Sequence, residues 1–166
     1  RVVGLEAQAR YDIKPWSGWI AYTVSRSTRW NPTSPEALSQ YDQTHNINVN
    51  GSVQLGRNWQ LSARWRHVTG NPYTPIVGGV FDADNDLYIP TRGSFYSERL
   101  QAFNQFDLSL DKKWVFDGWI LSFYLDIQNI SNSKNIEAVR YSYNYAQTTA
   151  VEGLPFLPIL GLKGEF

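Results

Sequence analysis

Hydrophobic and polar residues alternate along most of this chain, with the period of two that is typical of β-strands whose two faces meet different surroundings. The first example covers residues 5–13, where apolar side chains at odd positions alternate with charged or amide side chains. The pattern predicts seven long strands, at residues 5–13, 19–28, 47–55, 59–66, 105–111, 119–128 and 160–166. An all-β, antiparallel architecture is therefore expected.

The connections between these strands are of two kinds that alternate along the chain. Three are short turns, at residues 14–18, 56–58 and 115–118. Three are long and irregular, at residues 29–42, 70–101 and 129–158. Outer-membrane β-barrels show this asymmetry, with short periplasmic turns and long extracellular loops. The fold class predicted is therefore a transmembrane antiparallel β-barrel in the bacterial outer membrane.

Residues 136–145 leave the strand count open between seven and eight. If this tyrosine-containing segment belongs to the last loop, seven strands remain, and an open seven-stranded sheet would leave two edges of unpaired backbone groups in hydrocarbon. Residues 1–166 would then be the C-terminal part of a larger barrel, about its last third, with its plug domain absent from this chain. As an eighth membrane strand the segment would permit a closed small barrel, but the long loops would then face the periplasm. We expect seven strands.

Aromatic residues favour a membrane-facing apolar surface over a soluble core. The chain has 7 Trp, 10 Tyr and 8 Phe, and indole rings prefer the bilayer interface. Five tryptophans near the short turns are the predicted membrane girdle: Trp16, Trp19, Trp59, Trp114 and Trp119. Charges of both signs on the opposite faces are predicted to line a wet lumen, as cross-strand pairs or as contacts to a plug: Arg10, Arg64, Arg66, Asp107, Asp111 and Asp126. In a soluble barrel the same charges would face solvent.

Composition removes several classes of function. The formal net charge is zero and there is no Cys, so a nucleic-acid partner, a disulfide framework and thiol chemistry are not expected. No nucleophile elbow, phosphate-binding Gly-rich loop or catalytic triad order is present. We therefore predict no enzymatic activity, no catalytic residues and no cofactor.

One acidic segment resembles the beginning of a calcium loop. Asp82, Asp84 and Asp86 have the alternate-oxygen spacing, but Leu87 and Gly93 occupy the positions where such loops need Gly and a bidentate Glu. An acidic surface turn is the preferred interpretation, so no metal site is predicted.

The long connection at residues 70–101 contains aromatic and arginine side chains that could hold an anionic or planar ligand at the mouth of a barrel. The ligand-contact candidates are Tyr73, Phe81, Tyr88, Arg92, Tyr96 and Arg99. The alternative, that they pack loops together and meet lipopolysaccharide, is the stronger one. The last loop adds Tyr141, Tyr143 and Tyr145.

Four segments together resemble the C-terminal barrel portion of TonB-dependent outer-membrane receptors. They are Thr69-Gly-Asn-Pro-Tyr-Thr-Pro75, Phe106-Asp-Leu-Ser-Leu-Asp-Lys-Lys-Trp114, Leu125-Asp-Ile-Gln-Asn-Ile-Ser-Asn132 and the terminal run from Gly153 to Phe166. Within the last segment, the alternating residues that end on an aromatic side chain resemble a barrel-assembly signal: Leu160, Leu162 and Phe166. Gly164 stands where a bulkier apolar residue is often found.

The resemblance implies a plugged barrel of 22 strands that imports a scarce ligand such as a siderophore, cobalamin or a carbohydrate, energised through TonB. The partners implied are outer-membrane lipid and lipopolysaccharide, the remaining strands and plug of the same receptor, the TonB complex and the barrel-assembly machinery. Two alternatives stay open. One is a passive or structural small barrel, and the other is a barrel fragment that acts as a client of the assembly machinery.

Overall fold

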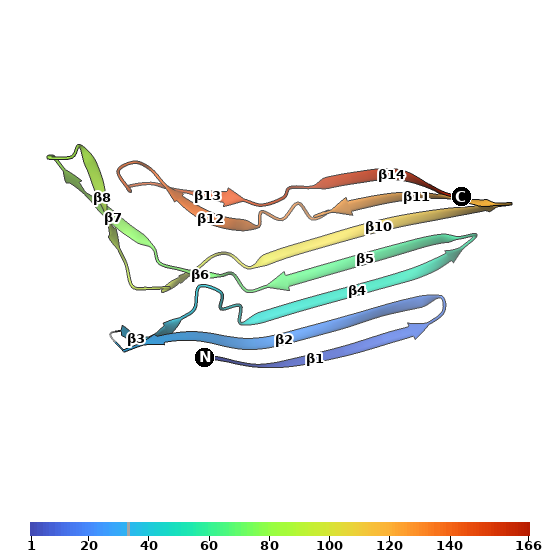
Figure 1. The fold of residues 1–166 in the computed structure, drawn as a ribbon, viewed down its shortest axis with the longest axis horizontal. Helices are drawn as coiled ribbons and strands as arrows, with labels where there is room; N and C mark the ends of the chain where they lie inside the picture. The colour runs from blue at the N-terminus through green and yellow to red at the C-terminus, as the bar shows by residue number, and fades with distance from the viewer. Residues whose placement is uncertain (33) are drawn as a thin grey trace.

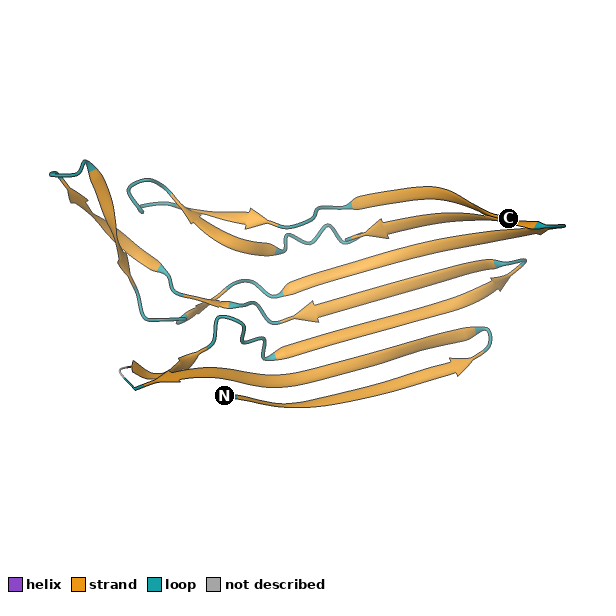
Figure 2. Cartoon of the chain, in the orientation of Figure 1, coloured by secondary structure: helices purple, strands orange, loops and turns teal. Residues whose placement is uncertain are grey.

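The computed structural model describes residues 1–32 and 34–166 as an all-β, antiparallel structure dominated by one open sheet of long strands (Figures 1 and 2). In spatial order the long strands are β1 (Val2–Ile13), β2 (Trp16–Asn31), β4 (His45–Gly56), β5 (Trp59–Val68), β10 (Phe103–Phe116), β11 (Trp119–Gln128) and β14 (Leu157–Glu165). The predicted seven-stranded meander is confirmed. Strand β3 (Ser34–Leu38) pairs only with the distal end of β2.

Every short turn lies at one end of the sheet and every long connection at the other (Figure 1). The turns are tighter than the sequence pattern indicated, since β2 already begins at Trp16 and β10 continues to Phe116. At the second turn Gly56, Arg57 and Asn58 all have positive φ, of 85°, 48° and 60°. Two positive-φ residues in a two-residue loop match the right-handed twist of the flanking strands.

The long connections contain short strands that the sequence pattern did not predict. Residues 70–101, expected to be irregular, form two small two-stranded sheets: β6 (Pro72–Tyr73) with β9 (Glu98–Arg99), and β7 (Ile76–Asp82) with β8 (Leu87–Arg92). The last connection holds β12 (Ile136–Tyr141) and β13 (Thr148–Glu152), which pair with each other. The eight-strand interpretation was therefore wrong, because β12 lies outside the main sheet.

The two faces of the main sheet differ in chemistry. Directly paired residues share a face, and one row of partners runs Ile13, Trp16, Val53, Leu61, Leu110, Leu125 and Leu160. The adjacent row on the other face runs Asp12, Ser17, Ser52, Ser62, Ser109 and Asp126. We call these the apolar face and the polar face.

The apolar face is uncovered. Val68, at 2% exposure, is the one fully buried hydrophobic residue in the part of the chain that the structure describes, whereas Leu160 and Leu162 are 70% and 69% exposed. No described segment packs across this face, so its side chains do not form a core. Among residues 1–32 and 34–166 no helix is long and apolar enough to cross a membrane.

Both edges of the sheet are unpaired along most of their length. Strand β1 pairs only with β2, and β14 only with β11. Because the meander has an odd number of long strands, β1 and β14 run in the same direction, toward the short turns (Figure 1). The sheet is open in this structure.

Candidate functional site

All six charged residues predicted for the lumen lie on the polar face. The strand registers place Arg10, Asn50, Arg64 and Asp107 in one transverse row that crosses five strands, with Trp19 of β2 between Arg10 and Asn50. Arg66 and Gln105 continue the same face toward the long connections, and Asp111 and Asp126 continue it toward the turns. The register thus assembles side chains that are more than a hundred positions apart in sequence.

Asp107 is the centre of a hydrogen-bond network on this face. Its carboxylate accepts hydrogen bonds from Arg64 Nη2 at 2.7 Å, Arg64 Nε at 3.0 Å, Gln105 Nε2 at 2.8 Å and the Asn129 backbone N–H at 2.9 Å. The Asp107 side chain is 13% exposed while that of Arg64 is 56% exposed. This cross-strand pair therefore anchors a basic side chain on the polar face and also ties the end of β11 to β10.

A hollow of about 270 Å³ opens beside this pair, lined among others by Ser62, Arg64, Asp107 and Asp126. The arrangement offers a guanidinium, carboxylates and hydroxyls to one volume. Such a set can hydrogen-bond a hydroxylated ligand, or a polypeptide segment that carries charges of both signs. Elsewhere on the face, Arg10 pairs with Asp12 of its own strand at 3.4 Å, and Arg66 lies over the Phe103 ring at 5.3 Å.

Arg99, one of the predicted ligand contacts, is used within the protein instead. Its guanidinium donates to the Asp42 carboxylate, to the Asp42 carbonyl at 2.8 Å and to the Gly70 carbonyl at 3.1 Å. Burial of Asp42, whose side chain is 1% exposed, opposes ionisation. The N–H of Ser27 and the guanidinium of Arg99 outweigh it, and the pKa of Asp42 falls below its ordinary value.

Three of the aromatic candidates pack the loops against one another. Phe81 and Tyr88 face each other across the β7–β8 hairpin with ring centroids 5.1 Å apart, and Tyr143 of the last connection meets Tyr88 edge-on at 5.5 Å. The Tyr143 hydroxyl also donates to the Asp86 carbonyl at 2.6 Å. These contacts favour loop packing, which was the stronger interpretation of the sequence.

The remaining candidates do not converge on one another. Tyr96 has a φ of 52° and its hydroxyl donates to Gln40 Oε1 at 3.4 Å. Burial, together with the nearby Tyr141 and Glu98, raises the pKa of Tyr73. Arg92 is exposed on β8. Tyr141, Tyr143 and Tyr145 do not share a strand face, because β12 ends at Tyr141 and Tyr145 has a φ of 57°.

The acidic segment forms the turn of the β7–β8 hairpin. Asp82 accepts hydrogen bonds from the Asp84 backbone N–H at 3.1 Å and from Asn85 Nδ2 at 2.9 Å. The Asn85 amide, as the main contributor, lowers the pKa of Asp82. In the described residues, no three His, Asp or Glu side chains gather as metal ligands would.

Four of the five predicted girdle tryptophans lie on the apolar face near the short turns: Trp16, Trp59, Trp114 and Trp119. Trp19 was wrongly grouped with them, because the register pairs it with Arg10 and Asn50 on the polar face. Three rings form a stack at the same end, since Trp119 lies between Phe116, at 4.6 Å, and Phe166, at 5.8 Å. Phe166 thus lies beside the turn between β10 and β11, with its side chain exposed.

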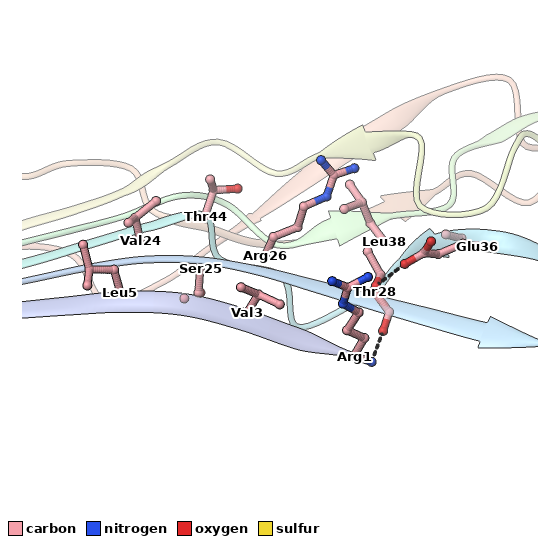
Figure 3. Close-up of a pocket in the computed structure, with 12 residues that line it drawn as sticks. Arg1, Val3, Leu5, Val24, Ser25, Arg26, Thr28, Glu36, Leu38 and Thr44 are labelled. Atoms are coloured by element: carbon pink, nitrogen blue, oxygen red, sulfur yellow. Dashed lines mark hydrogen bonds between the residues drawn. The ribbon is translucent and has the colours of Figure 1, made fainter.

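A second hollow, of about 840 Å³, lies at the opposite end of the sheet, between the start of β1 and the ends of β2 and β3 (Figure 3). Val3, Leu5, Val24 and Leu38 supply apolar walls, and Thr28 joins two elements by accepting from the Arg1 N-terminus at 2.8 Å and donating to Glu36 at 2.6 Å. None of the charged polar-face residues around Asp107 lines this hollow, so we do not take it as the functional site.

Comparison with known proteins returns no match to any family model, to any curated protein or to any solved structure.

Proposed function

We propose that this chain forms part of the wall of an outer-membrane β-barrel transport protein of the TonB-dependent receptor type. The observation that carries the proposal is the pairing of an uncovered apolar face with a charged, hydrogen-bonded polar face on one meander of long strands. Water would solvate the apolar face at high cost, whereas acyl chains would cover it.

The dimensions of the apolar face support a bilayer as its surroundings. Strand β11 has 10 residues, and at about 3.3 Å per residue with a tilt of about 40° such a strand spans about 25 Å. That is about the height of the apolar band of outer-membrane barrels. Further strands paired to the edges β1 and β14 would satisfy the backbone groups that hydrocarbon cannot.

In this proposal the polar face lines the lumen, and the hollow beside Arg64 and Asp107 contacts either the transported ligand or a plug. The loops joined by Asp42–Arg99 and by Tyr143 form the extracellular mouth. The ligand would be scarce and actively imported, of the siderophore, cobalamin or carbohydrate class. Energy would come from the TonB complex.

Two adjacent residues of β10 test the orientation. Ser109 lies on the polar face and Leu110 on the apolar face. The sequence of 166 residues contains no Cys that would react alongside an introduced one. In isolated outer membranes that contain the native protein, a Cys at position 109 should react with a membrane-impermeant maleimide, whereas a Cys at position 110 should react only after detergent is added. Equal reactivity of the two before detergent would contradict a lipid-facing apolar surface.

Uptake by energised cells tests the transport step. Accumulation of a labelled siderophore, cobalamin or oligosaccharide should stop when an uncoupler removes the inner-membrane gradient. Uptake that continues down a concentration gradient would instead support a passive pore.

A further inference from the structure

We propose that Lys112, Trp59 and Trp114 form a binding site for the phosphodiester of an anionic phospholipid at the short-turn rim of the apolar face. The inference rests on the proposed function, because it requires lipid against this face. It goes beyond outer-membrane lipid as a general partner, because it assigns a headgroup class and the side chains that bind it.

Lys112 is a charged residue in an apolar row. Its partners across the two neighbouring strands are Trp59 in β5 and Phe123 in β11. Over the described residues of the seven long strands, this face carries one other charged side chain of the Lys, Arg, Asp or Glu type, Arg26, which is near the opposite end. Two cations at opposite rims of an apolar band are in the positions where long basic side chains reach the interface.

The surroundings of the ammonium group suit an anion from outside the chain. Lys112 Nζ lies 5.3 Å from the Trp59 ring centroid and 5.5 Å from that of Trp114. It donates to the Arg57 carbonyl in the turn before β5, and an ammonium has three N–H donors. Among the described residues, no carboxylate lies within ion-pair distance of the Lys112 ammonium group.

The turn before β5 places a second cationic side chain at the same rim of the sheet as Lys112. Arg57, whose carbonyl holds the ammonium, is itself exposed. A headgroup phosphate would meet the charge of Lys112 while its acyl chains extend along Leu110, Phe123 and Leu162 of the apolar face. The two indoles, which favour the level of the headgroups, would flank it.

Native mass spectrometry of the intact protein in mild detergent tests the site, with phosphatidylglycerol and phosphatidylcholine added at equal concentration. Lys112→Gln should reduce retained phosphatidylglycerol about fivefold, the factor that one basic residue contributes near an anionic surface. Lys112→Arg should preserve it. The matched control is Lys113→Gln, which removes the next positive charge along β10 from the polar face and should leave lipid retention unchanged.

Glycerol phosphate, which has the anion but no acyl chains, should neither bind nor compete, and this separates a lipid headgroup from free phosphate. Without any substitution, brominated phosphatidylglycerol should quench tryptophan fluorescence of the protein in nanodiscs more than brominated phosphatidylcholine does. Equal quenching, or equal lipid loss in Lys112→Gln and Lys113→Gln, would overturn the site. Failure of the lipid site would leave the proposed function intact if Ser109→Cys still reacts with the maleimide before detergent and Leu110→Cys only after it.

Discussion

The carboxylate of Asp42 and the guanidinium of Arg99 form an ion pair that joins two long connections, and the two residues are 57 positions apart in sequence. The same carboxylate accepts the Ser27 backbone N–H, so the pair also reaches the end of β2. Loss of one partner would leave the other charge buried without compensation.

We expect Asp42→Asn to destabilise this loop assembly by about 3 kcal/mol, because an amide cannot neutralise Arg99 and its NH₂ group would face the guanidinium donors. Hydrogen exchange should accelerate at the Ser27 and Leu100 amides. Asp84→Asn, in the exposed hairpin turn, is the control and should leave both amides protected.

Acid should weaken the same contact. Because the folded pKa of Asp42 lies below its ordinary value of 3.8, its contribution to stability is complete above that value and is lost as the pH falls through the lower, folded-state pKa. The protection factor of the Ser27 amide, which compares its exchange rate with that of an unfolded chain at the same pH, should therefore be constant from neutral pH down to about 4 and should fall only in stronger acid. A loss of protection near pH 6 would contradict this assignment.

Gly70 allows the two connections to approach. A Cβ built there would lie 1.8 Å from the Leu100 carbonyl oxygen, which is a backbone atom and cannot rotate away. Gly70→Ala should therefore displace the segment that presents Arg99, and limited proteolysis should cleave residues 70–101 faster. Gly51→Ala, where a Cβ would meet nothing within 4 Å, should be cleaved at the wild-type rate.

Asp107 and Arg64 should differ in their contribution to stability although they form one ion pair. Asp107→Asn removes a largely buried acceptor of four hydrogen bonds and should cost about 2 kcal/mol. Arg64→Gln changes a more exposed side chain and should cost less than about 1 kcal/mol. Urea unfolding of the native protein from lipid vesicles measures both, and equal costs would argue against Asp107 as the centre of the network.

A charged side chain in the middle of the apolar face should lower the free energy of unfolding. Leu125 lies between Leu110 and Leu160 in the register, and Leu125→Arg should cost about 2 to 4 kcal/mol in a bilayer. The matched variant is Ser109→Arg on the polar face of the neighbouring strand, which should fold with nearly wild-type stability. If both variants unfold at the same urea concentration, the two faces do not differ in environment.

The sequence pattern predicted the main sheet well because alternation is a local signal that repeats in every strand. Residues 119–128 were predicted with the bounds that β11 has, since Gly118, with a φ of 88°, marks the start clearly. The β7–β8 hairpin was missed because Pro75, Gly78, Gly79 and Pro90 interrupt the alternation of its short strands. Trp19 was misplaced because nearness to a turn does not determine which face a side chain occupies.

The contacts at the candidate site were less accessible to sequence reasoning. The charges of the polar face could be grouped because they occupy alternate positions along their strands. The choice of Asp107 as partner for Arg64, however, depends on the pairing register of two strands, and the two residues are 43 positions apart in sequence. Arg99 carried no local sign that it would bind Asp42 rather than a ligand. Long-range pairing of this kind is specified by how the loops pack, which alternation does not encode.

The hydrogen bond from the Tyr143 hydroxyl to the Asp86 carbonyl makes one surface of two connections, which matters for antibody binding to the purified protein and for engineering. An antibody against this surface would meet a discontinuous epitope built from both connections, and a peptide copied from either one would lack the other half. Grafting the β7–β8 hairpin onto another scaffold would likewise require residues 136–152 to be transferred with it.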